Sequence, residues 1–199
     1  MMGRLREHRS ALLGGAVVVL LAVALLLGGA AKRRGNETAR LDTAREFLET
    51  LYTADAVRWR EHLAAGEEEW SDYRAAYAAV ATEACQASME HGLFQLVDAF
   101  TAETGAKPVI DDILLESAED GGEGDALTPY FYTVRLHLER PKGGATKTYR
   151  ADGTLQLLQY EDTAPRVHTI AVNDQNLFRY IQQREALWGV PKPLPAGMK

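Results

Sequence analysis

The stretch YFYTVRLHLE, residues 130–139, decides the fold class of this protein. Every second side chain along it is apolar: Tyr130, Tyr132, Val134, Leu136 and Leu138. The residues between them are polar or charged, except Phe131. A period of two kept over this length is typical of a β-strand with one buried and one exposed face. The stretch therefore predicts a sheet that packs one face against a core.

Three further strands are predicted around this one, at residues 109–116 (VIDDILLE), 146–160 and 166–172. Pro141-Lys142-Gly143-Gly144 supplies a hairpin turn, and the acidic, glycine-rich residues 117–128 supply a mobile loop. Gly153 inside the third predicted strand suggests a β-bulge. Because short hairpins join strands that run in opposite directions, we expect an antiparallel meander of four strands.

The residues before the sheet have helical periodicity. Thr43-Ala44-Arg45-Glu46 fits a capping box, and apolar residues follow it at helical spacing: Phe47, Leu48, Leu51 and Tyr52. Asp55 fits the N-cap of a second helix that has Val57, Trp59 and Leu63 on its apolar side and ends at Gly66.

A long third helix, ending near Gly92, is predicted from an apolar stripe: Trp70, Tyr73, Tyr77, Val80, Ala84 and Met89. A helical pattern continues through Leu93, Leu96, Val97 and Phe100 to Gly105. After the last strand, Asn173 or Asp174 caps a final helix that carries Leu177, Phe178, Ile181 and Trp188. The N-terminal helices are the only elements large enough to cover the sheet, so the predicted class is α+β.

The N-terminal segment, residues 11–31 (ALLGGAVVVLLAVALLLGGAA), contains no charged residue. As a helix it would be about 31 Å long, close to the ~30 Å hydrocarbon core of a bilayer. We therefore predict a transmembrane anchor. A cleaved signal peptide is the alternative, although the apolar run is long for one and the basic cluster Lys32-Arg33-Arg34 follows it directly.

The predicted organisation follows from this anchor. It comprises a short basic tail (1–10), a transmembrane helix (11–31), a juxtamembrane linker (32–40), a soluble α+β domain (41–188) and a proline-rich tail (189–199). Both flanks of the span are basic, so the positive-inside rule discriminates poorly. The short N-terminal tail favours a cytoplasmic N-terminus. We expect a single-pass protein of the cell membrane with its domain outside the cytoplasm.

Charge narrows the range of partners. Six of the 22 basic residues but only one of the 28 acidic residues precede residue 36, so residues 36–199 carry a net charge of −11. A domain this acidic repels phosphate backbones and anionic lipid surfaces, which argues against nucleic-acid binding and against a domain lying flat on lipid. Protein partners are the expectation, and a homo-oligomer is compatible with it.

Metal and cofactor sites are not predicted. Cys85 is the only cysteine, which excludes an intramolecular disulfide and any site with several cysteine ligands. His8, His62, His91, His137 and His168 have no spacing typical of zinc ligands. No glycine-rich loop with the spacing of a phosphate-binding motif follows a predicted strand.

Asp111 and Asp112 are the candidates for acid–base chemistry. Adjacent strand residues point to opposite faces, so one carboxylate should share a face with aliphatic side chains. Burial there would raise its pKa and suit a general acid or base, with His137 on the next strand as a partner. The alternative is a strand end or edge where both acids reach water.

Trp70, Tyr73 and Tyr77 are the candidates for a protein interface, because Trp and Tyr are enriched at interface hot spots. The alternative is that these three aromatic residues pack in the core. Which reading applies depends on how much of the stripe is exposed.

The order of helices and then a curved antiparallel sheet resembles the cone-shaped fold of nuclear transport factor two-like domains. The resemblance spans residues 41–172 and rests on three local stretches: FLETLY (47–52), TEACQASMEHG (82–92) and GTLQLL (153–158). Together with the anchor, the chain is similar to the extracytoplasmic domains of conjugation and type IV secretion assembly factors. This resemblance implies a structural component of an envelope complex. Other relatives of the fold are isomerases and dehydratases that use an acid inside the cone.

The leading hypothesis is a membrane-anchored, non-enzymatic module that interacts with proteins of an envelope complex. One alternative is a small-ligand-binding or isomerase-like domain with Asp111 or Asp112 inside its cavity. The other is a regulatory domain secreted after signal cleavage.

Overall fold

The computed structural model describes residues 35–65, 70–90, 93–118, 126–140, 148–160 and 163–173. The chain divides into two units, Met1–Ala39 and Arg40–Lys199. The predicted span at 11–31, the turn at 141–144, the final helix and the proline-rich tail lie outside the described residues. Within the part of the chain that is described, no helix is both long and apolar enough to cross a membrane.

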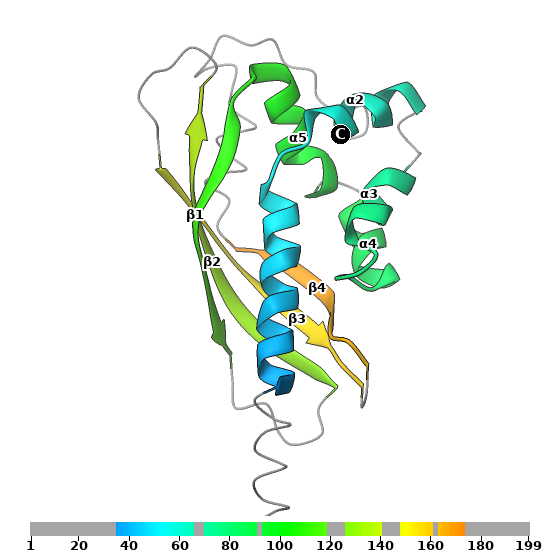
Figure 1. Ribbon diagram of the computed structural model, residues 1–199, viewed down its shortest axis with the longest axis vertical. Coiled ribbons are helices and arrows are strands. Elements are labelled where there is room, and N and C mark those ends of the chain that lie inside the picture. Colours follow the sequence, from blue (N-terminus) through cyan, green and yellow to red (C-terminus); the bar gives the residue numbers. More distant parts are fainter. Residues whose placement is uncertain are drawn as a thin grey trace, which may run out of the picture. The chain divides into compact units, whose positions relative to one another are not determined.

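The four predicted strands form one antiparallel sheet, in the order β1-β2-β3-β4 (Figure 1). They are β1 (Lys107–Ser117), β2 (Leu127–Glu139), β3 (Thr148–Leu158) and β4 (Arg166–Val172). The predicted alternation of buried and exposed side chains along residues 130–139 is confirmed, because the five alternate apolar residues of 130–138 are all buried. Phe131, on the opposite face, is 50% exposed. The α+β class is therefore correct.

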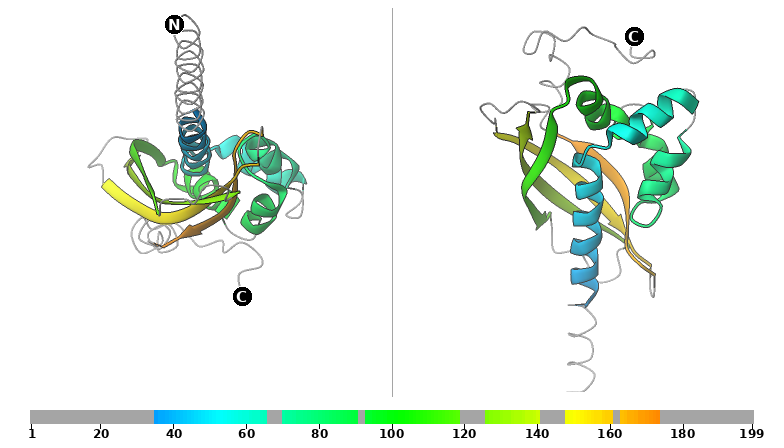
Figure 2. Two further views of the ribbon diagram at one scale, coloured as in Figure 1. Left: turned by 90° about the horizontal axis from the view of Figure 1, so that it is seen from below. Right: turned by 45° about the horizontal axis from the view of Figure 1, so that its top comes forward.

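Helices cover the inner face of this twisted sheet (Figure 2). Residues 40–52 form a helix along that face, tied to the sheet at both ends. Arg40 Nε donates a 2.8 Å hydrogen bond to Gln159 Oε1, and Tyr52 Oη lies 3.3 Å from Tyr132 Oη. Four further helices follow: α2 (Ala56–Ala65), α3 (Ser71–Tyr77), α4 (Glu83–Met89) and α5 (Leu93–Thr104).

The first predicted helix start is wrong. Thr43 does not cap a helix, because the backbone is helical from residue 35 onward and Thr43 lies inside that helix. Residues 35–40, predicted as part of a linker, are helical as well. The apolar spacing after residue 43 was interpreted correctly, since Ala44, Phe47, Leu48 and Leu51 are buried.

Asp55 caps α2 as predicted, but the buried side of α2 differs from the prediction. Asp55 Oδ1 accepts the backbone N–H groups of Val57 at 2.9 Å and Arg58 at 3.1 Å. Val57 and Leu63 are about half exposed, whereas Trp59 and His62 are buried. The helix is thus rotated so that an aromatic and an imidazole ring, rather than the aliphatic residues, face the core.

The long third helix is wrong as well, because the chain breaks into α3 and α4 around residues 78–82. There the backbone pairs with the edge strand β4 instead of continuing the helix. Val167 N–H donates to Val80 O at 2.7 Å, and Thr82 N–H donates to Val167 O at 2.9 Å. Thr82 Oγ1 then accepts the N–H of Cys85 at 3.2 Å and starts α4, leaving Ala84 exposed.

Gly153 does not form the predicted bulge, since it pairs regularly with Tyr132 and Val172. A Cβ atom at this position would collide with the Tyr132 ring and with the backbone oxygen of Ala171. Glycine is therefore required by close packing. The register shifts lie elsewhere, between Ile110 and Asp112 and between Gln156 and Leu157.

Gly153→Ala should destabilise the fold at the upper end of the about 1–3 kcal/mol typical of overpacking, because Ala171 contributes backbone that cannot rotate away. Urea denaturation followed by circular dichroism measures the change. Gly35→Ala is the matched control: its Cβ meets nothing within 4 Å, so stability should stay the same or rise slightly. Equal stability of the two variants would contradict the packing role of Gly153.

Candidate functional site

Asp111 and Asp112 both reach solvent. The register passes from Ile110 opposite Leu136 to Asp112 opposite Arg135, so Asp111 is the extra residue of a β-bulge. The bulge interrupts the alternation on which the sequence argument rested. The two side chains are 41% and 48% exposed, and neither shares the buried face.

The two carboxylates are held by the neighbouring strand β2. Asp111 Oδ1 lies 2.7 Å from His137 Nδ1, and Arg135 Nη2 donates to Asp112 Oδ2 at 2.6 Å. The Arg135 hydrogen bond lowers the pKa of Asp112. Acid–base catalysis of the expected kind requires a carboxylate whose pKa is raised in an apolar site, and Asp112 is not such a group. Exposed pairs of this type contribute little to stability.

The space between the sheet and the helices, where a ligand cavity was considered, holds large buried side chains. They come from the first helix, from α3 to α5 and from the sheet, and the largest are Tyr52, Tyr73, Tyr77, Tyr130, Phe47 and Phe100. Tyr52 and Tyr132 meet at their hydroxyl groups, so these two buried hydroxyls are paired with each other.

The aromatic stripe divides between core and surface. Tyr73 and Tyr77 are buried, which fits the core reading for these two residues. Trp70 is only partly buried. Its ring lies 4.2 Å from the His62 ring and 5.6 Å from the Tyr73 ring, measured between centroids.

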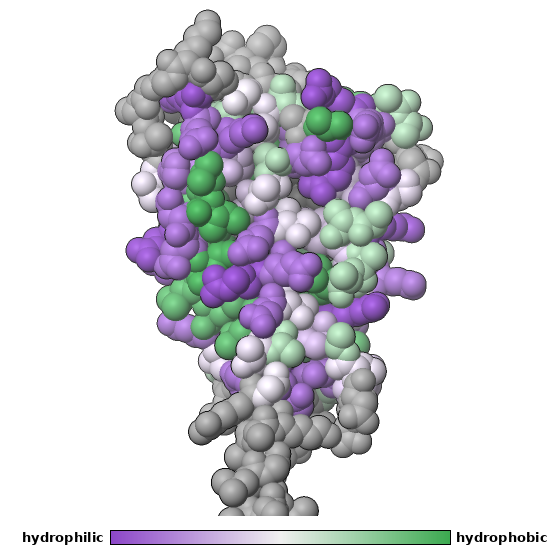
Figure 3. Space-filling model, in the orientation of Figure 1, coloured by the Kyte–Doolittle hydropathy of each residue, from purple (hydrophilic) through white to green (hydrophobic). Residues whose placement is uncertain are grey.

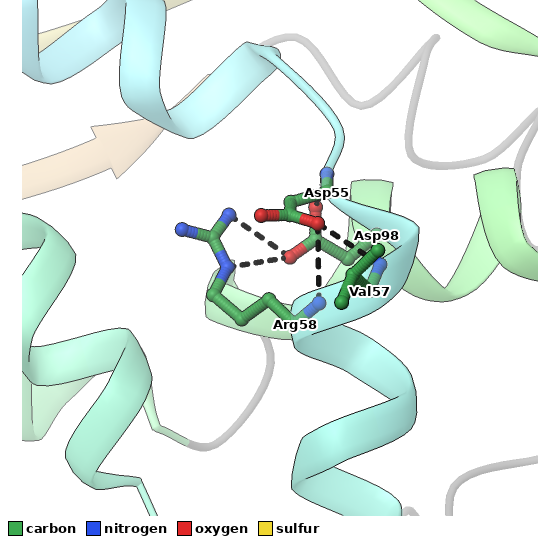
Figure 4. Close-up of polar contacts among 4 residues, drawn as sticks. All are labelled: Asp55, Val57, Arg58 and Asp98. Carbon is green, nitrogen blue, oxygen red and sulfur yellow. Dashed lines mark hydrogen bonds and ion pairs between the residues drawn. The ribbon is translucent and has the colours of Figure 1, made fainter.

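A buried ion pair next to these rings was missed by the sequence analysis (Figure 4). Arg58 Nη2 lies 2.9 Å from Asp98 Oδ2, and its Nε donates to the same oxygen at 3.0 Å. Asp98 Oδ1 accepts the backbone N–H of Asp55 at 2.6 Å. The pair thereby joins α2 to α5. A lone acid inside the apolar run LFQLVDAF (93–100) was the available signal.

The electrostatics of this cluster follow from its burial. Burial raises the pKa of Asp98, while the Asp55 N–H and the Arg58 guanidinium oppose that rise. The Arg58 guanidinium also lies 4.8 Å from the centre of the Tyr73 ring, within cation–π range. The Arg58 backbone N–H lowers the pKa of Asp55. The arrangement is suited to fixing two helices, because its charges face each other rather than a cavity.

The described residues line at least two open grooves on the surface. The larger, about 680 Å³, lies beside Trp70, with three alanines (Ala75, Ala78, Ala81) and the polar residues Ser71, Arg74, Glu83, Gln86 and Arg166. The smaller, about 420 Å³, lies between Arg45, Glu49 and Thr53 of the first helix and the Asp111 bulge. Among the described residues, no group of three or more His, Cys, Asp or Glu side chains is placed to hold a metal ion.

Comparison with known proteins does not assign this chain to a family. No protein-family model matches the sequence, and no curated protein matches it significantly.

Removing one member of the buried ion pair should be costly, and removing both should not. Arg58→Met leaves Asp98 without its counter-ion and should cost about 3–5 kcal/mol. The double variant Arg58→Met/Asp98→Leu should recover part of that loss, because neither charge then remains buried, while the Asp55 N–H still loses its acceptor. Chemical denaturation of the wild type, the two single variants Arg58→Met and Asp98→Leu, and the double variant measures the coupling free energy between the two side chains. Additive losses would show that the two side chains act independently.

The thiol of Cys85 should be inert in the native protein. Burial raises its pKa to about 12, so the reactive thiolate is scarce at mildly alkaline pH. A chromogenic disulfide reagent should label the folded chain very slowly and label one equivalent per chain once guanidinium unfolds it. Rapid native labelling would contradict the burial of Cys85.

Proposed function

We propose that this chain is a membrane-anchored, non-enzymatic interaction module. Residues 11–31 would hold it in the cell membrane, with residues 41–188 outside the cytoplasm, where they bind protein partners of an envelope complex, in conjugation or secretion. The observation that carries the proposal is the solvent exposure of the two candidate catalytic acids, Asp111 and Asp112. The acids considered for catalysis reach solvent, while large aromatic side chains occupy the space beneath the sheet.

The finer fold assignment, a nuclear transport factor two-like cone, belongs to the same proposal. A helix along the inner face of a twisted four-stranded antiparallel sheet supports it. Fold alone does not determine activity, so the choice between enzyme and interaction module rests on the site. Exposed Asp111 and Asp112 favour the module over an isomerase-like domain.

Site-specific photo-crosslinking in cells tests the proposal. A photoreactive amino acid is placed at Ser71, on the larger groove, and separately at Phe131, on the outer sheet face of the full chain. An interaction module should give a discrete adduct with one membrane-complex protein from at least one of these positions. Absence of adducts from both, together with a monomeric mass by light scattering, would overturn the proposal.

Alkaline extraction of membranes distinguishes the secreted alternative. An anchored chain stays in the pellet, because its span is buried in hydrocarbon. A domain released by signal cleavage appears in the supernatant, shortened at its N-terminus by mass spectrometry. The second result would remove the anchor from the proposal.

A further inference from the structure

The groove beside Trp70 has the size and shape of a recognition site for part of another molecule. Its volume, about 680 Å³, is within the roughly 300–1,000 Å³ of ligand-binding clefts, and it is open to solvent. α3, α4 and the first residue of β4 line it. An open trough on the surface suits a segment of chain better than an enclosed small molecule.

One side of the groove consists of small side chains. Ala75 and Ala78 are exposed there, and the pale green surface over α3 and α4 in Figure 3 is in this region. Residues without bulk beyond Cβ allow the backbone of a bound segment to approach closely. Trp70 adds a broad apolar surface that is held in place by its contact with His62.

Gln86 offers polar atoms to this groove. It is 7% exposed, and its Nε2 donates a 3.2 Å hydrogen bond to Ala81 O, which fixes the amide. Among the described residues, no hydrogen bond reaches its Oε1. A buried amide held in this way presents an acceptor next to a donor, which is the pattern that a peptide group complements.

Arg166 supplies a cation. Arg74, which also lines the groove, is neutralised by Glu90, with Nη2 2.5 Å from Oε1. No hydrogen bond or ion pair joins the Arg166 guanidinium to another described residue. Residues 36–199 carry a net charge of −11, so an exposed arginine without a described acidic partner is unusual in this domain. Glu83 also lines the groove, so its charges are mixed, and Arg166 is the cation there that no described acid pairs.

We propose that this groove binds a peptide segment of a partner protein that carries an acidic side chain. The carboxylate pairs with Arg166, the Gln86 amide bonds a neighbouring peptide group, and an apolar side chain packs on Trp70. Arginine suits this role because its guanidinium fork matches a carboxylate. The inference rests on the proposed function and adds the place and the chemistry of the contact.

The test uses the photoreactive residue at Ser71, which lies in the groove, and at Phe131, which does not, in the full chain in cells. The expected result is an adduct from Ser71 whose attachment site in the partner lies next to an Asp or Glu. Arg166→Gln should reduce this adduct about tenfold or more, the effect of losing a charge-assisted hydrogen bond. Ala78→Met, which fills the groove without changing its charge, should reduce it as well.

Arg45→Gln is the matched control, because Arg45 is an exposed arginine that lines the other groove. It should leave the Ser71 adduct unchanged. Circular dichroism confirms that each variant is folded. An adduct from Phe131 alone, or a Ser71 adduct that survives Arg166→Gln, overturns the inference and leaves the proposed function standing. A Ser71 adduct with nucleic acid also overturns it. If neither Ser71 nor Phe131 gives an adduct, both the inference and the proposed function are contradicted.

An independent measurement uses a random heptapeptide phage library panned against the purified full chain. Enriched peptides should contain Asp or Glu, and replacement of that residue by its amide should weaken binding by a similar factor. Binding should also weaken as salt is added, because an ion pair at an open groove is screened. Enrichment of peptides without an acid would contradict the role of Arg166.

Discussion

The arrangement of this domain depends on the contact between Tyr132 on β2 and Gly153 on β3. Because residue 153 has no Cβ, the Tyr132 ring lies directly against the neighbouring strand. Its hydroxyl then meets that of Tyr52, the last residue of the first helix. Burial raises the pKa of Tyr132 to about 12, so the phenol keeps its proton even at mildly alkaline pH, and either hydroxyl can donate to the other. The end of the helix is thereby fixed over the sheet.

The position of Tyr52 in turn limits where α2 can begin. Only Thr53 and Ala54 separate it from Asp55, whose N–H donates to Asp98 and whose side chain caps α2. A carboxylate is costly to bury, and an ion pair often gives no more stability than an apolar pair of the same size. The Arg58–Asp98 pair therefore sets the relative orientation of α2 and α5, because its hydrogen bonds form only when the two helices meet in this way.

The sequence predicted the sheet well, because the alternation at residues 130–138 reflects burial on one face and needs no knowledge of the partner strands. It predicted the helical layer less well. The stripe from Trp70 to Met89 has helical spacing throughout, and only the pairing of Val80 and Thr82 with Val167, far along the chain, interrupts it. The bulge at Asp111 was hidden for a similar reason, since a local pattern of alternation cannot record an extra residue relative to β2.

These two missed features also decide where chemistry can occur. The bulge leaves Asp111 and Asp112 at the surface, where they pair with His137 and Arg135 instead of lying among aliphatic side chains. The break between α3 and α4 has the opposite effect. It turns residues 78–82 toward β4, so that Ala78, Gln86 and Arg166 come from three separate segments to line one groove. The departure from helical periodicity thus contributes to a groove at which a buried amide and an exposed arginine meet.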